Sequence, residues 1–280
     1  MFDYHVHPGY SIDAEGSVED FCHSALERGL KEIAFTTHLD TDTSTDDCFV
    51  VVQGERVETL SGGWLEDYEM TIRAAEDKYR ELGLKVLLGV EVDYIPNVES
   101  ILPEQFYSTD FDIVLGSAHL VDHIAISAGD RAREAFRRYT IEELGERYYG
   151  LLLDAIETGL FDIMSHLDLY RRFGQVFYGE KIREIWRSYL DDLVMSMRRN
   201  NVGFEINTSP LRRGQDEPMP EENIVRALKE SGVTTATVGS DAHSPDHVGV
   251  GIEKAIQILK RVGFSSVTTF DRRISSTHDI

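Results

Sequence analysis

The stretch KVLLGVE at residues 85–91 has the composition of a β-strand that is buried on both faces, and it ends in a carboxylate. Two runs of the same kind, IAFTT at 33–37 and DIVLG at 112–116, precede and follow it. Nearly continuous apolar and β-branched runs are typical of parallel sheets, because helices cover both faces of such a sheet. These three runs therefore predict an α/β fold with a parallel sheet.

Short strand-like runs alternate with helical stretches from one end of the chain to the other. The predicted strands are 2–6, 32–37, 85–90, 112–117, 162–165, 203–207 and 234–239. Seven such alternations predict a mainly parallel sheet, which at this length forms either a closed barrel or an open, doubly wound sheet. The segment DYHVHPGYS at 3–11 contains no G-x-G-x-x-G fingerprint, which argues against a dinucleotide-binding open sheet.

The helical stretches have recognisable ends. Ser17 followed by Asp20 predicts an N-cap, and Thr140 with Glu143 predicts a capping box. Further helices are predicted over 64–82, 181–199, 221–230 and 248–260. Neither a Pro/Ser-rich linker nor an internal repeat divides the chain, so we expect a single domain over residues 1–280.

Composition excludes several classes of protein. The chain of 280 residues carries 28 basic and 50 acidic side chains, and its net charge is −22. A surface this acidic repels phosphate backbones, which makes nucleic acid an unlikely partner and argues against anionic membranes. No apolar run approaches the roughly 20 residues of a membrane span. Two cysteines and no apparent signal peptide favour a cytoplasmic protein with reduced thiols.

Histidines gather at the ends of the predicted strands. Six of the ten stand there, namely His5, His7, His38, His119, His166 and His243. The third strand ends in Glu91, and Asp241 follows the seventh. In a parallel barrel the C-terminal strand ends converge on one face, so we expect these side chains in one pocket.

Imidazole and carboxylate groups are the ligand types that bind zinc, manganese and iron ions. With Asp13 the set offers nine donors, which is too many for one tetrahedral ion and suits two or three divalent ions. A lone histidine is more often a structural residue, and we interpret His23 and His278 in that way. His123 and His247 lie on loops of the active face; the sequence leaves their role open and favours solvent-exposed side chains over site residues.

The order of these residues resembles that of the PHP superfamily, named for polymerase and histidinol phosphatase. The resemblance runs from His5 to His243 and includes the segment Thr37-His38-x-Asp40. The motifs most similar to histidinol-phosphate phosphatases are GVEVDY (89–94), GSAHLVD (116–122), SHLDL (165–169), FEINTS (204–209) and GSDAH (239–243).

This resemblance implies a distorted (β/α)7 barrel, similar to a TIM barrel, with a trinuclear metal site at its C-terminal mouth. The three implied ligand sets are His5, His7, Glu91 and Asp241; Glu91, His119 and His166; and Asp13, His38 and His243. Among them, Glu91, Asp241 and His243 are the candidate catalytic residues. Asp13 departs from the family pattern, because many relatives carry His at that place.

The implied reaction is hydrolysis of a small phosphate monoester. Clustered divalent ions lower the pKa of bound water and polarise a phosphoryl oxygen, so no covalent nucleophile is needed. The phosphate also needs local positive charge in so acidic a protein. Arg171 and Arg172 after SHLDLY, and Arg212 and Arg213 after INTSPL, are the candidates on the active face.

The substrate that this resemblance implies is L-histidinol phosphate, hydrolysed to L-histidinol and phosphate. We expect acidic residues of 40–47 to meet its ammonium group, and the 40–63 loop is a candidate lid. One alternative is a PHP phosphoesterase for another small ester or a nucleotide. Another is an amidohydrolase-type barrel, which also opens with His-x-His but needs fewer ligands. A metal-stabilised module without turnover is a third, although it would be expected to lack ligands. The oligomeric state is left open.

Overall fold

Strand β5 (Lys85–Asp93) lies inside the main sheet and is buried from Val86 onward. It pairs in parallel with β2 (Glu32–Leu39) on one side and with β6 (Ile113–Ser117) on the other. In the β2–β5 register His38 lies opposite Glu91, so two predicted ligands share one level of the sheet. Strand β2 runs two residues and β5 three residues further than predicted.

The computed structural model describes residues 1–280, apart from the side chain of Asp130. The remaining strands of the main sheet are β1 (Phe2–Val6), β9 (Ile163–Met164), β10 (Gly203–Asn207) and β11 (Ala236–Gly239). The seven strands stand in the order β1-β2-β5-β6-β9-β10-β11, and every pair is parallel. All seven predicted strands are therefore present.

The two edges of this sheet meet and nearly close it into a barrel. Just beyond β11, the backbone N–H of Asp241 donates to the His5 carbonyl at 2.7 Å. The N–H of His7 donates in turn to the Ala242 carbonyl, also at 2.7 Å. The distorted (β/α)7 barrel is thus confirmed over the open, doubly wound sheet.

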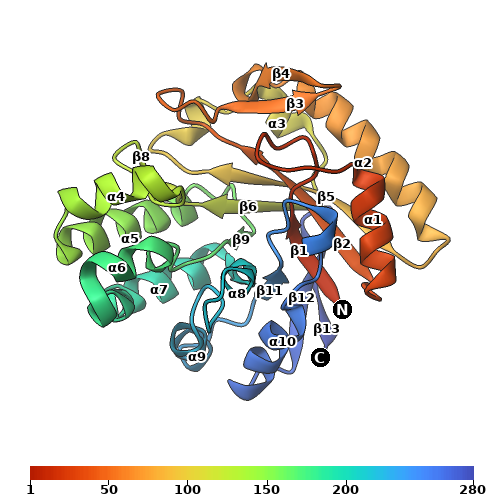
Figure 1. The fold of residues 1–280 in the computed structure, drawn as a ribbon. Helices are drawn as coiled ribbons and strands as arrows, with labels where there is room; N and C mark the ends of the chain where they lie inside the picture. Colours follow the sequence, from red (N-terminus) through yellow and green to blue (C-terminus); the bar gives the residue numbers. More distant parts are fainter.

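Helices surround the outside of the barrel (Figure 1). They are α1 (Val18–Glu27), α2 (Trp64–Arg80), α3 (Glu104–Ser108), α4 (Gly129–Arg138), α5 (Ile141–Glu157), α6 (Arg171–Tyr178), α7 (Leu190–Asn200), α8 (Ser209–Arg212), α9 (Glu222–Glu230) and α10 (Ile252–Arg261). Capping boxes at Ser17 and Thr140 start α1 and α5, as predicted. None of the helices that the structure describes combines the length and apolar composition needed to cross a bilayer.

Two predicted helices have different bounds in the structure. The 181–199 helix is instead a 3₁₀ segment, Gly179–Ser188, followed by α7. The break falls at Tyr189, whose φ is −117° and whose ring stacks on Tyr149 at a centroid distance of 4.8 Å. Helix α10 begins four residues later than predicted, since Gly249 and Gly251 adopt positive φ values that do not continue a helix.

Three antiparallel hairpins were not predicted. They are β3 (Phe49–Val52) with β4 (Glu55–Glu58), β7 (Leu120–Val121) with β8 (Ile124–Ala125), and β12 (Ser266–Asp271) with β13 (Ile274–Asp279). The first lies within the 40–63 loop, and the second directly follows His119. The third brings the chain termini close together, where the His278 ring packs on Phe2 at 4.6 Å (Figure 1).

Candidate metal centre

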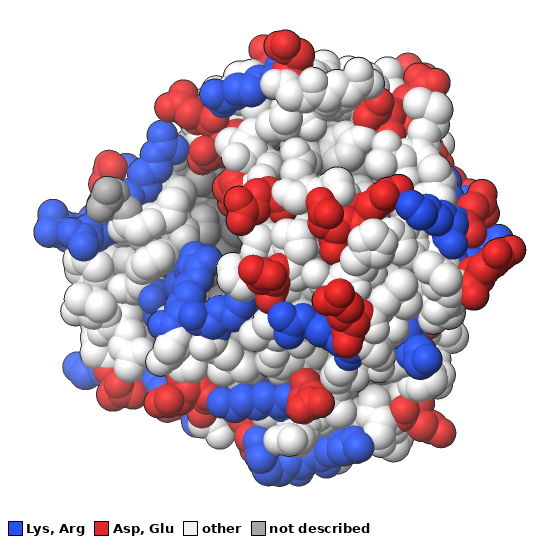
Figure 2. Space-filling view, turned by 45° about the vertical axis from the view of Figure 1, so that its right-hand side comes forward, with Lys and Arg blue, Asp and Glu red and all other residues white. Residues whose placement is uncertain are grey.

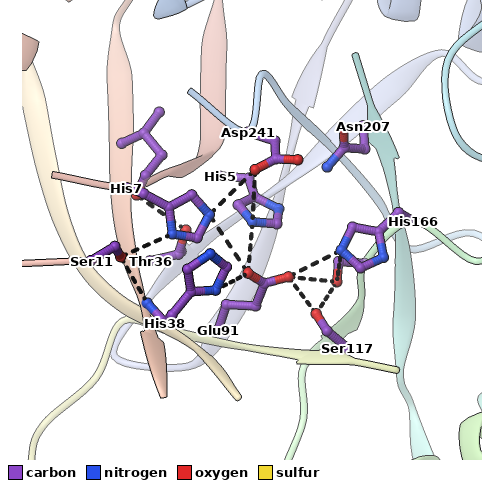
Figure 3. A network of polar contacts seen from close by, with 12 residues as sticks. His5, His7, Ser11, Thr36, His38, Glu91, Ser117, His166, Asn207 and Asp241 are labelled. Carbon is purple, nitrogen blue, oxygen red and sulfur yellow. Dashed lines mark hydrogen bonds and ion pairs between the residues drawn. The ribbon is translucent and has the colours of Figure 1, made fainter. Parts of the chain in front are cut away.

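Six of the seven strands of the barrel contribute side chains to one cluster at their C-terminal ends. Figure 3 shows His5, His7, His38, Glu91, His166 and Asp241 of this cluster. The loop after β1 adds Asp13. The nine predicted ligands brought together in this way are His5, His7, Asp13, His38, Glu91, His119, His166, Asp241 and His243. Their convergence follows from the parallel topology, because each strand delivers its last side chains to the same mouth.

Glu91 stands between two groups of imidazoles. Figure 3 shows it between His5 and His38 on one side and His166 on the other. Its Oε2 lies 3.3 Å from His5 Nε2 and 2.9 Å from His38 Nδ1. Its Oε1 lies 3.1 Å from His166 Nε2 and 3.5 Å from His119 Nε2. One oxygen thus faces each group, which is the arrangement that a carboxylate shared by two cations requires.

Two further carboxylates complete the cluster. Asp241 Oδ1 lies 3.4 Å from His7 Nε2 and 3.4 Å from His243 Nδ1. Asp13 Oδ2 lies 3.2 Å from His243 Nε2, and its Oδ1 lies 3.8 Å from His38 Nε2. Asp13 is more exposed than the other ligands, with 58% of its side chain accessible. The residue that departs from the family pattern therefore still points into the site.

The donor atoms at the centre fit a cation. Among the described side chains, His5 Nε2 and His7 Nε2 are buried and have no hydrogen-bond partner. Buried polar atoms are normally paired, since an unsatisfied one costs free energy. Four groups of three side chains could each hold a metal ion, because the three ligand atoms within each group lie within 4.8 Å of one another. The groups are His7, His38 and His243; His5, His7 and Asp241; His38, Asp40 and His119; and Glu91, His119 and His166.

The histidines of the cluster differ in the direction in which their pKa values are shifted. Burial lowers the pKa of His7 well below its usual value, and the charge on His38 adds to this. Burial also lowers the pKa of His119 to about 3. At His38 the hydrogen bond and charge of Glu91 outweigh burial and raise the pKa to about 10. Although burial would raise the pKa of Glu91, the charge of His5 holds it well below its usual range.

Three acidic residues lie next to the ligands. Glu205 and Asp93 were not predicted as site residues, whereas Asp40 belongs to the 40–47 segment that was expected to meet the substrate's ammonium group. Glu205 on β10 lies behind His5, and Asp93 accepts a hydrogen bond from the His119 backbone N–H at 2.9 Å. Asp40 faces the site, where burial and the charge of Glu91 raise its pKa to about 7 despite the nearby His38. Asp93 stands two residues after Glu91 on β5, so strand alternation beside a predicted ligand was an available signal for it. Strand β10 carries no predicted ligand, so Glu205 had no such signal.

The cluster forms the floor of a pocket of about 630 Å³. Arg172, Arg212 and Arg213 line it together with Asp40 and Asp47. Apolar lining comes from Leu120, Leu169 and Phe173. Figure 2 shows a hollow with basic side chains below it and acidic side chains to its right, so its rim is divided by charge.

The adjacent arginines Arg171 and Arg172 have different surroundings. Arg171 is buried, its Nε donates to Asp168 Oδ2 at 3.0 Å, and its Nη2 donates to the Pro218 carbonyl. It does not line the pocket, so we correct the prediction that Arg171 contacts phosphate. Arg172 does line the pocket, and its buried Nε has no partner among the described residues.

The four remaining histidines lie outside the cluster. His23 is exposed on α1 and contacts Tyr79, and His278 lies on the C-terminal hairpin, as their structural interpretation requires. His247 lines the pocket rim. His123 is 67% exposed, which agrees with its interpretation as solvent-exposed, and its ring also pairs with Asp42.

The PHP domain family matches residues 3–209 of this chain. The chain belongs to the PHP family. The matched range contains most of the ligand cluster, and the barrel closure brings Asp241 and His243, which follow that range, into the same cluster. The resemblance drawn from the sequence motifs is thereby confirmed.

Curated relatives within this family are similar to the chain over nearly its whole length. A protein of Deinococcus radiodurans named "Probable histidinol-phosphatase" is 28% identical over 98% of both chains. The "Histidinol-phosphatase" of Lactococcus lactis is 26% identical over 96% of this chain and 93% of its own. The crystal structure of the histidinol phosphate phosphatase of that organism, complexed with zinc, L-histidinol and phosphate, has a TM-score of 0.80, 23% sequence identity and 98% coverage of both chains. This member of the PHP family thus has the same barrel fold as that crystal structure.

Proposed function

We propose that this PHP protein is a metal-dependent phosphatase that hydrolyses L-histidinol phosphate to L-histidinol and phosphate. The observation that carries the proposal is the position of Glu91 between two groups of imidazoles at the floor of a pocket. The full-length similarity to proteins named histidinol-phosphatase supports the choice of substrate.

Two or three divalent ions, zinc, manganese or iron, belong to this proposal. His5, His7, Glu91 and Asp241 would hold one ion, and Glu91 with His119 and His166 a second. Asp13, His38 and His243 would hold the third. Such ions, when bound, lower the pKa of water and polarise a phosphoryl oxygen.

Three arginines are assigned to the phosphate group. Arg172, Arg212 and Arg213 line the pocket, and a planar guanidinium can donate two parallel hydrogen bonds to phosphate oxygens. Arg212 is held in place because its Nη2 donates to the Asp241 carbonyl at 2.8 Å and its Nη1 to the Ser240 carbonyl. Its side chain is thus tied to the backbone that carries the ligand Asp241.

Acidic residues of the 40–47 segment are assigned to the substrate's ammonium group. Asp40 and Asp47 line the same pocket as the three arginines. A zwitterionic ester can therefore place its phosphate and its ammonium group against side chains of opposite charge. A nucleic acid has no such cation, and the net charge of −22 repels its backbone.

The deciding experiment compares kcat/KM for L-histidinol phosphate, other small monoesters and a short single-stranded DNA, with metals quantified in the same preparation. Histidinol phosphate is expected to be the best substrate. If another monoester is better by about tenfold, or about 1.4 kcal/mol in transition-state binding, the substrate assignment is wrong. Hydrolysis of that ester would then identify a PHP phosphoesterase with a different substrate.

A matched substrate tests the acidic wall separately. The amine-free analogue 3-(imidazol-4-yl)propyl phosphate differs from histidinol phosphate by the ammonium and its stereocentre. Asp47→Asn is expected to lower kcat/KM for histidinol phosphate and to leave that for the analogue nearly unchanged. An equal loss on both substrates would contradict the assignment of the ammonium group to this wall.

A further inference from the structure

The β7–β8 hairpin is anchored to the body of the protein at its tip. Asp122 and His123 form its two-residue turn, with φ values of 48° and 66°, as in hairpin turns that need two left-handed residues. Asp122 Oδ2 accepts a hydrogen bond from the Tyr139 hydroxyl at 2.7 Å and pairs with Arg147 of α5 at 2.8 Å. These two contacts fix the position of the turn.

The second turn residue reaches away from that anchor to the segment that follows β2. His123 Nδ1 lies 2.6 Å from Asp42 Oδ2. Asp42 is only 5% exposed, whereas His123 is 67% exposed. Since Nδ1–H can donate in either protonation state of the ring, the contact does not depend on His123 being charged.

Asp42 organises residues 40–48, which we call the 40–48 segment. Its Oδ1 accepts hydrogen bonds from the Ser44 backbone N–H at 3.0 Å and from the Ser44 hydroxyl at 2.7 Å. The Thr45 hydroxyl donates to the Asp42 carbonyl at 2.9 Å. The contact with His123 therefore holds a locally folded segment rather than one side chain.

The 40–48 segment forms part of the pocket wall. Asp40, Thr45 and Asp47 line the pocket, while Leu120 and Ala125 of the β7–β8 hairpin line it as well. The His123–Asp42 pair thus joins two pocket walls that are about eighty residues apart in sequence.

We infer that His123 is a positioning residue, which holds the 40–48 wall of the pocket in its substrate-binding position through its contact with Asp42. The kinetic part of this inference rests on the proposed function, because it needs the substrate. The structural part does not. Truncation of so exposed a side chain removes the contact without opening the core, so the variant is expected to fold.

The test uses the full chain and compares His123→Ala with His123→Gln and with His23→Ala. Amide hydrogen exchange in residues 41–48 is expected to be faster in His123→Ala, because the segment loses its outer attachment. KM for histidinol phosphate is expected to rise about fivefold, which corresponds to about 1 kcal/mol, while kcat stays within about twofold.

The other two variants separate positioning from a general effect on folding. Gln can donate a side-chain N–H to Asp42, so His123→Gln is expected to restore much of the wild-type exchange rate and KM. His23→Ala removes an exposed histidine with a single side-chain hydrogen-bond partner, Tyr79, outside the pocket, and is expected to change neither quantity. In an Asp42→Ala background, His123→Ala is expected to have no further effect.

Unchanged exchange in residues 41–48 of His123→Ala would overturn the inference. A fall in kcat with KM unchanged would also overturn it, since that pattern indicates a role in the chemical step. If the wild-type protein does not hydrolyse histidinol phosphate, the proposed function fails, and the exchange experiment still decides the role of His123.

Discussion

Glu205 lies directly behind His5, with its Oε1 2.7 Å from His5 Nδ1. Both side chains are buried, so this contact fixes the orientation of the imidazole and leaves Nε2 directed at Glu91. A Cβ at Gly239 would overlap both Glu205 and His5, which explains why glycine opens the GSDAH motif. Carboxylates behind metal-ligating histidines orient the ring and raise its basicity.

Glu205→Gln is therefore expected to weaken metal binding although Glu205 belongs to none of the ligand groups. We expect a loss of about 10- to 100-fold in affinity, as for other residues that support a ligand. Competition with a chromogenic chelator measures it. Glu157→Gln, which changes an exposed carboxylate paired with Arg199, is the control and is expected to bind metal normally. Equal affinities in the two variants would show that the carboxylate behind His5 has no such role.

Glu91→Gln is expected to reduce turnover by orders of magnitude. The variant removes a negative charge that faces imidazoles on both sides and that we assign to two cations. Steady-state kinetics at saturating metal measure the loss. His23→Gln is the matched control, because His23 lies on α1 outside the cluster, and it is expected to keep nearly full activity. Similar activities in the two variants would contradict the assignment of the strand-end residues to the site.

Arg171→Ala is expected to lower the stability of the fold, whereas Arg172→Ala is expected to raise KM. Arg171→Ala leaves Asp168 buried without its ion-pair partner, and loss of a buried pair costs about 3–5 kcal/mol of unfolding free energy. Arg172→Ala removes a side chain that lines the pocket and is expected to raise KM with little change in stability. Denaturant unfolding and steady-state kinetics on both variants separate the two effects. If Arg171→Ala is as stable as the wild-type protein and has a raised KM, Arg171 contacts the phosphate and our correction is wrong.

The contrast between these arginines shows what the sequence could not resolve. Neighbouring residues on a helix point about 100° apart, and sequence alone does not say which of the two faces the pocket. The ligands were predictable for the opposite reason, because parallel strand ends must share one mouth whatever the details of packing. His38 and Glu91 therefore meet as expected.

Individual side-chain contacts between residues far apart in sequence were not predictable in this way. Glu205 approaches His5 across 200 residues, and Asp42 meets His123 across 81. Both depend on where the barrel closes and how a short hairpin turns, and neither leaves a periodic signal. The β7–β8 hairpin has only two residues in each strand, too few for an alternating pattern to indicate it.

Purified protein is expected to carry two or three transition-metal ions per chain. Nine oxygen and nitrogen donors converge on one mouth, and two of their buried atoms, His5 Nε2 and His7 Nε2, have no hydrogen-bond partner among the described residues. Elemental analysis after metal supplementation measures the content, and chelation is expected to abolish activity reversibly. One ion or none per chain would contradict the assignment of three ligand sets.

Metal binding is expected to release protons, and the ring of His38 is one source of them. In the metal-free site burial opposes the charged ring, but the hydrogen bond and charge of Glu91 raise the pKa of His38 to about 10. The imidazole is then protonated at neutral pH, whereas a metal ligand must be neutral, so an ion that binds to His38 displaces a proton. The apparent affinity should therefore rise by about tenfold per pH unit for that proton and level off near pH 10.

The pKa of His119, lowered to about 3 by burial, means that this ligand is already neutral and releases none. Calorimetric titration in buffers of different ionisation enthalpy counts the protons, and His38→Ala is expected to remove one of them. An affinity independent of pH between 7 and 9, with no proton released, would show that His38 does not take part in metal binding.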